Sequence, residues 1–521
     1  MKTIRNFYPF LYALFPPLFL YTYNIEEVDV EVILVPIAAA LVLTALFWLV
    51  ARALVRDRRK ATLIAFLASF MALSFGHFLN FVQATLLKNP KLPVVLPLVV
   101  WVLLFTALGV LVLRTRKDLG ALVSILSTFV LLLVVLSLVQ IGIFHLGSLR
   151  SRAADGGLAA EIKALQAGAP PRDRLPDIYY LIFDRYGNEE ILREYFRYDN
   201  SAFTGFLNRS GFYVASESHS NYIGTFLSLS SSLNMDYLTG LVKKGPVQKR
   251  SINRMLRDFK VWRLLKPLGY RYIHLGSWYE PTKSNPRADL NFQGAGLLGF
   301  NQEFLLKFIE ATVFNPLAKG AFMFPNARES VLQKFDLLAT IPEMEGPKFV
   351  FMHMLLPHHP FVFGPDGSVP DRKAAEAKTQ DQKYIDQVIY ANTKIMAVVG
   401  TILAKSKTPP IIILQADEGP GDEEKPLALM KDADSKKRAI LTVRIRCGIL
   451  NAYYLPGVDT SSLSTTLTPV NTFRLIFNFY FGGRYPLLED RTFHTVQDKT
   501  TVKSFRPLPF SMLSVPPSKT P

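Results

Sequence analysis

Five long apolar runs fill the first 150 residues of this 521-residue chain and restrict what it can fold into. The runs cover residues 7–23, 32–51, 61–87, 94–113 and 119–149. A helix needs roughly 20 apolar residues to cross the hydrocarbon core of a bilayer, and four of the runs reach that length. The first run is shorter and contains two prolines, but no small-residue cleavage site of a signal peptide follows it. The sequence therefore predicts a transmembrane domain of five helices at residues 1–150.

Basic residues lie in every second loop of this region. Cytoplasmic loops of membrane proteins are enriched in Lys and Arg. The basic loops are the N-terminus and the second-to-third and fourth-to-fifth connections, with Lys2, Arg5, Arg56, Arg58, Arg59, Lys60, Arg114, Arg116 and Lys117. The first-to-second loop is acidic, and the third-to-fourth loop contains two lysines. We therefore expect a multi-pass cell membrane protein with a cytoplasmic N-terminus and a periplasmic or extracellular C-terminal domain.

The formal net charge of +17 could indicate binding to nucleic acid. Much of the surplus, however, lies in the membrane-flanking loops, and no basic–aromatic repeat is present. We expect membrane lipids as partners and no nucleic acid. The chain has one cysteine, Cys447, so an internal disulfide cannot hold the outer domain together, and we interpret this residue as inert. A domain of roughly 330 residues can bury a sufficient core without a disulfide.

The remaining chain divides into a Gly- and Pro-containing linker at residues 151–175, a domain at 176–500 and a proline-rich tail at 501–521, which we expect to be loosely structured. Short apolar runs predict strands, and amphipathic patterns between them predict helices. The runs are at 177–184, 211–215, 270–276, 348–355 and 410–417, and the helical patterns include 250–265, 304–313 and 384–403. This alternation predicts an α/β domain with a largely parallel sheet.

Acidic residues end two of the predicted strands. Asp184 ends the first, and the pair Asp417–Glu418 follows the last. Ligands of open α/β sheets bind beyond the carboxyl ends of the strands. A buried acid needs a partner, and a metal ion is a common one. Taken singly, each acid could equally cap a helix or pair with Arg185, so it is their recurrence at strand ends that indicates a functional site.

Together with the strand-end acids, two segments indicate a family. "SNYIGTFLSLSSSLNMDYL" (220–238) and "FMHMLLPHHPF" (351–361) resemble the alkaline phosphatase/sulfatase superfamily. The resemblance is closer to its membrane-anchored branch, which includes lipoteichoic acid synthases and phosphoethanolamine transferases, and it covers about residues 175–494. Later stretches such as "RCGILNAYYLPG" (446–457) look like sulfatase-like membrane proteins of surface-polysaccharide gene sets. The resemblance implies an α/β/α sandwich of alkaline-phosphatase-like type behind the five-helix bundle.

The resemblance also implies a divalent metal ion, Mn²⁺, Mg²⁺ or Zn²⁺, and its ligands. Asp184 in "LIFDRYG" matches the acidic ligand after the first strand. Thr225 in "NYIGTFLSLSS" matches the nucleophile, which in this superfamily also contacts the metal. "ADEGPG" matches the later Asp-His-Gly motif, so Asp417 and Glu418 correspond to two further ligands. Thr225 could instead cap a helix in a turn rich in serine.

Three histidines within seven positions follow a predicted strand. His353, His358 and His359 lie among prolines in "HMLLPHHPF". A single histidine is usually structural, but such a cluster on a loop favours a functional site. The resemblance implies that His353 and His358 contact the transferred group, whereas His359 could only support them. His219 is a weaker candidate, and Asn221 could support the site from outside.

The predicted chemistry is consistent with these residues. A threonine hydroxyl becomes a useful nucleophile when a metal ion or a base lowers its pKa. A helix N-terminus stabilises the anion that forms there, and a metal ion would stabilise the charged transition state. The expected intermediate is a phosphothreonine, resolved by water or by an acceptor hydroxyl.

Two departures from the family pattern bear on the activity. Glu418 stands in place of histidine, which favours a harder metal than zinc or indicates that catalysis has been lost. The segment around Thr225 lacks the Cys-x-Pro-x-Arg pattern from which sulfatases form formylglycine. Ordinary sulfatase activity is therefore not expected.

We interpret the chain as a membrane-anchored, metal-dependent phosphotransferase or phosphoester hydrolase that acts on lipid-linked or cell-surface glycan substrates. The alternative is a catalytically degenerate domain that serves as a scaffold in envelope polysaccharide assembly. A phosphorylated Thr225 would distinguish the two.

Overall fold

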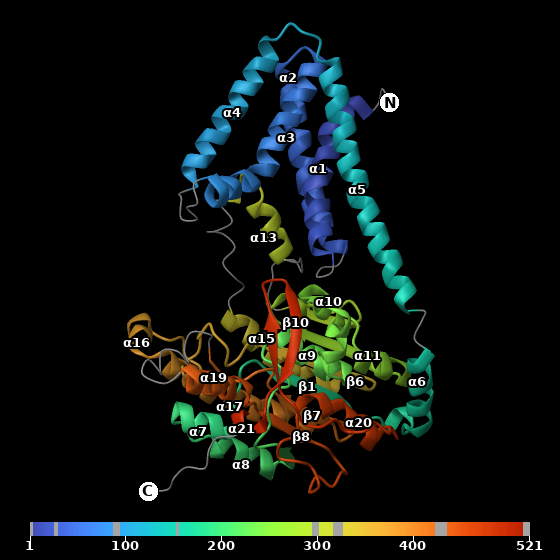
Figure 1. Ribbon diagram of the computed structural model, residues 1–521, viewed down its shortest axis with the longest axis vertical. Helices are drawn as coiled ribbons and strands as arrows, with labels where there is room; N and C mark the ends of the chain where they lie inside the picture. Colours follow the sequence, from blue (N-terminus) through green and yellow to red (C-terminus); the bar gives the residue numbers. More distant parts are fainter. Residues whose placement is uncertain are drawn as a thin grey trace. The chain divides into compact units, whose positions relative to one another are not determined.

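The computed structural model describes residues 4–25, 30–86, 94–152, 156–293, 302–315, 327–421 and 435–513. These residues form two compact units (Figure 1). The membrane unit consists of Met1–Asp155 together with Gly296–Phe324, and the α/β unit consists of Gly156–Ala295 together with Pro325–Pro521. The chain therefore passes between the two units three times.

Long helices at the five predicted positions make up most of the membrane unit. They are α1 (Ile4–Asn24), α2 (Leu34–Leu54), α3 (Arg58–Asn80), α4 (Val95–Arg114) and α5 (Gly120–Arg152). By length and composition, α2 to α5 can each cross a membrane, whereas α1 contains three prolines and more polar residues. A helix satisfies its own backbone hydrogen bonds, which hydrocarbon requires of any spanning segment. The predicted bundle of five helices is confirmed.

Among the described residues, one further helix meets the same measure of length and composition. This is α17 (Gln380–Lys405), which lies in the α/β unit. Its buried face, with Val388, Ile395 and Val399, packs into the core of that unit. Its other face is polar, as in an amphipathic helix of a water-soluble domain. We therefore interpret α17 as a core helix and not as a membrane span.

A short segment inserted into the α/β sequence belongs to the membrane unit. Helix α13 (Gln302–Glu310) buries Phe304 and Phe308 against the transmembrane helices. The helix itself was predicted at residues 304–313, but between strands of the α/β domain. Its pattern indicates only that one face is buried, and not which unit buries it.

The segment after α13 contacts the backbone of α3 directly. The Gly76 N–H donates to the Ala311 carbonyl oxygen at 2.9 Å, and the Val313 N–H donates to the Ala72 carbonyl oxygen at 2.7 Å. A Cβ atom on Gly76 would lie 2.3 Å from the Glu310 carbonyl oxygen. Only glycine permits this close approach of two backbones.

A seven-stranded sheet forms the centre of the α/β unit, with the order β2-β8-β7-β1-β6-β4-β5. The five strands β7, β1, β6, β4 and β5 run parallel. At one side of the sheet β8 is antiparallel to β7, and β2 is antiparallel to β8. The strands are β1 (Ile178–Phe183), β2 (Phe212–Val214), β4 (Arg271–Gly276), β5 (Leu290–Gln293), β6 (Lys348–Met354), β7 (Ile411–Gln415) and β8 (Asn451–Tyr454). The largely parallel sheet is as predicted.

Helices cover both faces of this sheet. In β1 every residue is buried, and side chains alternate between the two faces. Tyr179, Leu181 and Phe183 join one core cluster, whereas Ile178 and Tyr180 join the other. The first cluster includes α7 (Glu189–Phe196), α8 (Ser201–Arg209), α15 (Ala327–Thr340) and α17. The second includes α6 (Gly156–Gly168), α9 (Thr225–Asn234), α11 (Lys260–Leu265) and α20 (Thr472–Tyr480). The result is the predicted α/β/α sandwich.

Two segments contain more regular structure than their composition suggests. The expected linker contains α6, whose Leu165 is buried in the core. The expected tail contributes β10 (Thr501–Pro507), which pairs with β9 (Phe493–Gln497) and β3 (Val247–Gln248) in a small sheet, and α21 (Phe510–Leu513). Val502 of β10 is fully buried against Tyr222, which explains why this part of the tail is structured.

Candidate metal centre and active site

The order of the strands brings three predicted site residues together. Strand β1 lies between β6 and β7 and is parallel to both. Asp184 directly follows β1, Asp417 follows β7 after one residue, and His353 lies near the end of β6, where it is paired in register with Ile182. The Asp184 N–H also donates to the Met354 carbonyl oxygen at 2.9 Å. All three side chains therefore meet at the carboxyl edge of the sheet, where α/β sheets bind ligands.

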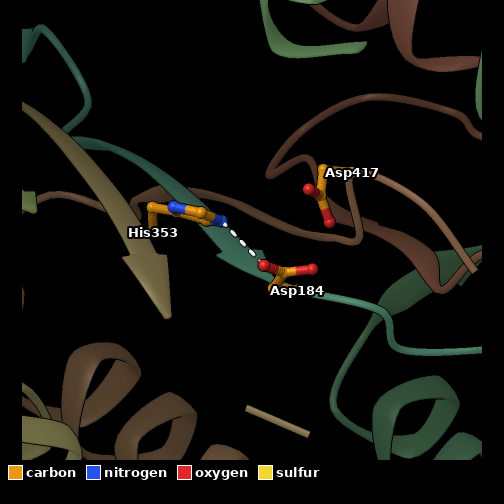
Figure 2. Close-up of side chains that lie close together, drawn as sticks. All are labelled: Asp184, His353 and Asp417. Carbon is orange, nitrogen blue, oxygen red and sulfur yellow. Dashed lines mark ion pairs between the residues drawn. The ribbon is translucent and has the colours of Figure 1, made fainter. Parts of the chain in front are cut away.

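The three side chains lie close enough to share one metal ion. One ligand atom from each of Asp184, His353 and Asp417 lies within 4.8 Å of the others, and all three residues are buried. The His353 Nε2 atom is 3.5 Å from the Asp184 Oδ2 atom. Figure 2 shows the imidazole and the two carboxylates directed toward one another.

Each of these residues has a buried polar atom without a hydrogen-bond partner among the described residues. The atoms are Asp184 Oδ1, His353 Nε2 and Asp417 Oδ2. Buried polar atoms are nearly always paired, so three such atoms in one place require an explanation. A divalent cation would satisfy all three, and two carboxylates with one imidazole are a ligand set that Zn²⁺ or Mn²⁺ accepts. The residues present thus fit the expected metal ion.

Burial and mutual repulsion alter the acidity of both carboxyl groups. Desolvation, followed by the charge of Glu418, raises the pKa of Asp184 to about 7. Desolvation, followed by the charge of Asp184, raises the pKa of Asp417 to about 8. A nearby cation would offset both effects. Without one, the two groups retain protons near neutral pH.

His353 is held in a form suited to metal binding. Burial lowers its pKa to about 4, so the ring is neutral. Its Nδ1 atom lies 2.6 Å from Thr282 Oγ1 and 3.0 Å from Ser277 Oγ. The Thr282 hydroxyl donates its own proton to the Tyr279 carbonyl oxygen at 3.3 Å, so it can accept the Nδ1 proton. That arrangement leaves a lone pair on Nε2, facing the carboxylates.

Thr225 lies beside this centre at the first position of α9. The preceding residue, Gly224, has φ of 108°, a left-handed conformation that favours glycine. The Thr225 hydroxyl lies close enough to Asp417 to lower the pKa of its carboxyl group. It is buried, and it lies where the unpaired N–H groups of the helix attract an anion.

Three other hydroxyls of this segment have structural contacts, whereas the buried Ser228 hydroxyl, one turn into α9, has no hydrogen-bond partner among the described residues. Ser230, Ser231 and Ser232 all lie in α9 beyond its first turn and donate to backbone carbonyl oxygens. These contacts are structural. In this segment, the Thr225 hydroxyl lies both at the N-terminus of a helix and close to a carboxylate of the site.

Glu418, which was also predicted as a ligand, has its carboxylate occupied by three donors. Its Oε1 atom accepts from Arg185 Nε at 3.2 Å. Its Oε2 atom accepts from Arg446 Nη2 at 2.8 Å and from the Gly224 N–H at 3.0 Å. The side chain lies next to Asp184, whose pKa its charge raises.

His358 and His359 line a cavity beside the centre. This cavity of about 30 Å³ is also bordered by Arg185 and Tyr384. The charge of His359 lowers the pKa of Asp184, so the two residues lie near each other. The structure thus divides the histidine cluster: His353 joins the carboxylates, and the other two lie at the adjoining cavity.

The weaker sequence candidates have structural contacts elsewhere. The His219 Nε2 atom contacts the Leu513 carbonyl oxygen at 3.2 Å, and burial lowers the pKa of this histidine to about 4. Asn221 donates to the Arg491 carbonyl oxygen and accepts from the Val470 N–H, both at 2.8 Å. Burial raises the pKa of the Cys447 thiol to about 12, which agrees with an inert residue.

Several residues near the centre were not anticipated. Ser277 and Thr282 follow β4, and Lys334 lies on α15 with its Nζ atom 3.3 Å from the His353 carbonyl oxygen. Burial lowers the pKa of Lys334 to about 7. For Lys334 the sequence offers one signal, which is a lysine within an amphipathic helical pattern.

Helices that can cross a membrane are followed by an α/β/α sandwich with two acids and a histidine at the carboxyl ends of its central strands. This is the arrangement expected from the resemblance of the motifs to the membrane-anchored, sulfatase-like branch of the alkaline phosphatase superfamily.

Several solved structures are similar to this chain. The periplasmic domain of EcEptC from Escherichia coli is 10% identical, covers 63% of this chain and 92% of its own, and has a TM-score of 0.40. The integral membrane lipooligosaccharide phosphoethanolamine transferase A from Neisseria meningitidis is 12% identical, covers 92% and 95%, and has a TM-score of 0.34. The presumed sulfatase yidJ from Bacteroides fragilis is 12% identical, covers 60% and 75%, and has a TM-score of 0.36.

No family model matches the chain, and no curated protein matches it significantly. With TM-scores below 0.5, the structural matches assign no substrate or activity to this protein.

Proposed function

We propose that this protein is a membrane-anchored, metal-dependent phosphotransferase or phosphoester hydrolase with a threonine nucleophile. The observation that carries the proposal is the meeting of three unpaired, buried ligand atoms, from Asp184, His353 and Asp417, beside a hydroxyl at a helix N-terminus. If these three residues had only a structural role, their buried ligand atoms would stay without partners, which costs substantial free energy of folding.

In the proposed reaction Thr225 Oγ1 forms a bond to the phosphorus atom of the substrate, and the bond from phosphorus to the leaving oxygen breaks. The proton that the Thr225 hydroxyl releases passes to the leaving oxygen. The N–H groups at the start of α9 stabilise the negative charge that develops on the phosphoryl oxygens. A bound divalent ion supplies Lewis-acid stabilisation of the same charge and lowers the pKa of the hydroxyl.

The second step resolves the phosphothreonine. Water or an acceptor hydroxyl forms a new bond to phosphorus, the bond to Thr225 Oγ1 breaks, and this oxygen takes up the proton that the attacking hydroxyl releases. His358, His359 and Arg185 line the adjoining cavity and are placed to contact the anionic substrate.

The anchor supports a lipid-linked or cell-surface glycan substrate. Helices α2 to α5 can cross a membrane, and the chain passes between the membrane unit and the α/β unit three times. The catalytic unit therefore stays near the bilayer and its headgroups. The basic loops favour a cytoplasmic N-terminus, so we propose that the α/β unit lies on the extracytoplasmic side.

The test is mass spectrometry of the full-length protein purified from cells that contain its natural substrates. We expect a phosphoryl or substituted-phosphoryl group on Thr225, and loss of this group with loss of activity in Thr225→Ala. Thr225→Ser keeps the hydroxyl and should retain part of the activity. An unmodified, metal-free protein whose Thr225→Ala variant complements a deletion fully would support the scaffold alternative instead.

A further inference from the structure

Glu418 and its partners form a cluster that is distinct from the three unpaired ligand atoms. Its three donors come from separate segments: Arg185 follows β1, Arg446 lies on α19 (Ser435–Cys447), and Gly224 precedes α9. The Glu418 side chain is 5% exposed, and those of Arg185 and Arg446 are 17% and 11% exposed. One buried carboxylate thus connects three loops around the site.

The Glu418 carboxylate differs from the neighbouring side chains because both of its oxygen atoms have hydrogen-bond partners. Asp184, His353 and Asp417 each have a buried ligand atom without a partner among the described residues, whereas both oxygens of Glu418 accept hydrogen bonds. Two guanidinium groups already neutralise Glu418. A cation bound to the same oxygens would be repelled by both of them at short range.

Two of the residues that Glu418 contacts have unusual backbone conformations. Gly224 has φ of 108°, and Arg185 has φ of 62°, which is uncommon for a residue with a side chain. Conformations of this kind persist where surrounding contacts hold them. The bond from the Gly224 N–H to Glu418 holds the turn that places Thr225 at the start of α9.

From this geometry we infer that Glu418 is a positioning residue for the Thr225 turn and not a ligand of the metal ion. The sequence predicted that Glu418 binds the metal ion. In the inferred role, Glu418 instead holds Gly224, Arg185 and Arg446 together. The importance of Glu418 for Thr225 rests on the proposed function. The contacts of the Glu418 carboxylate do not depend on whether the protein is active. The metal centre then has three side-chain ligands from Asp184, His353 and Asp417, with Thr225 beside it.

The experiment compares Glu418→Gln with Asp417→Asn in the full-length protein, using Mn²⁺ as the probe. Metal binding is measured on the metal-depleted protein, and amide hydrogen exchange is measured at Gly224 and Thr225. Asp417→Asn should weaken Mn²⁺ binding at least about 100-fold, whereas Glu418→Gln should change it by less than about threefold. Glu418→Gln should speed exchange at the Gly224 and Thr225 amides by about tenfold or more.

Two results would overturn the inference. One is loss of Mn²⁺ from Glu418→Gln to the same extent as from Asp417→Asn, which would make Glu418 a ligand. The other is unchanged exchange at Gly224 and Thr225 in Glu418→Gln. If Glu418→Gln does not fold, Arg446→Gln removes one cation, leaves the carboxylate in place and should give the same pair of results. Wild-type protein without Mn²⁺ binding would refute the proposed function, while the exchange comparison would still decide the role of Glu418.

Discussion

His353 connects the metal centre to the surrounding structure through three different atoms. Its Nε2 atom faces Asp184, its Nδ1 atom contacts Thr282 and Ser277, and its carbonyl oxygen accepts from Lys334. Burial keeps the imidazole neutral, because its pKa is lowered to about 4. A neutral imidazole is the form that binds a metal ion, so the groups behind His353 determine how well it can act as a ligand.

Replacing Thr282 by valine tests this arrangement. The change removes the hydroxyl 2.6 Å from Nδ1 and keeps a similar shape. Loss of such a supporting hydrogen bond typically costs 10- to 100-fold in metal affinity, and we expect an effect of about that size. Thr282→Ser keeps the hydroxyl and should bind Mn²⁺ or Zn²⁺ nearly as wild type does in a competition assay with a chelating dye. Equal affinities for all three proteins would show that Nδ1 needs no partner.

The raised pKa values of Asp184 and Asp417 predict how metal binding depends on pH. The values are about 7 and about 8, both above the ordinary 3.8. The metal-free folded protein therefore keeps protons that the unfolded chain releases, so its stability falls as pH rises from about 4 to about 8. A bound metal ion displaces these protons. The gain in melting temperature from Mn²⁺ should therefore be small at about pH 5 and large at about pH 8.

The control for this pH dependence is the variant Asp184→Asn/Asp417→Asn, which has neither titrating group. Its melting temperature should show no Mn²⁺ effect at either pH, and its metal-free form should lose less stability between them. A Mn²⁺-induced shift in the wild-type protein that is the same at both pH values would contradict the proposed protonation of the two carboxyl groups.

At the scale of elements, α3 makes a close backbone contact with α13 and the segment after it, although the two are distant in sequence. Gly76→Ala would place a Cβ atom 2.3 Å from the Glu310 carbonyl oxygen, so the segment would have to move. Phe304 and Phe308 would then lose burial, at up to about 1.5–3 kcal/mol for each. We expect faster proteolysis at residues 302–315 in detergent micelles.

Gly109 provides the matched control for this change. It lies within α4, and a Cβ atom there would meet nothing within 4 Å. Alanine is a better helix former than glycine by about 1 kcal/mol, so Gly109→Ala should be neutral or stabilising. Equal proteolysis of Gly76→Ala and Gly109→Ala would show that the α13 segment does not depend on the close approach to α3.

Apolar runs predicted the central elements of the fold well. The runs at 177–184, 348–355 and 410–417 became β1, β6 and β7 because fully buried strands need unbroken apolar sequence. The short strands β8, β9 and β10 carry no such signal, since they are partly exposed or contain polar residues. The helical pattern at 384–403 was placed in the α/β domain, where α17 lies, although α17 could also cross a membrane by length and composition alone.

At the scale of the whole molecule, strand ends predicted part of the site, and tertiary contacts supplied the rest. Asp184 and Asp417 could be predicted because they follow apolar strands, and parallel strands end at one edge. The contact between Thr282 and His353 could not, because it depends on β4 lying next to β6. Nor could the pairing of Glu418 with Arg446, because it depends on how α19 lies beside the turn that follows β7.

The most direct test of the account is a crystal structure of the full-length protein soaked with Mn²⁺, with anomalous scattering used to locate the ion. We predict one Mn²⁺ bound by Asp184, His353 and Asp417 at about 2.0–2.3 Å from each ligand atom, with Thr225 Oγ1 beside it. Absence of an anomalous peak at these three side chains, at an Mn²⁺ concentration well above that of the protein, would contradict the account.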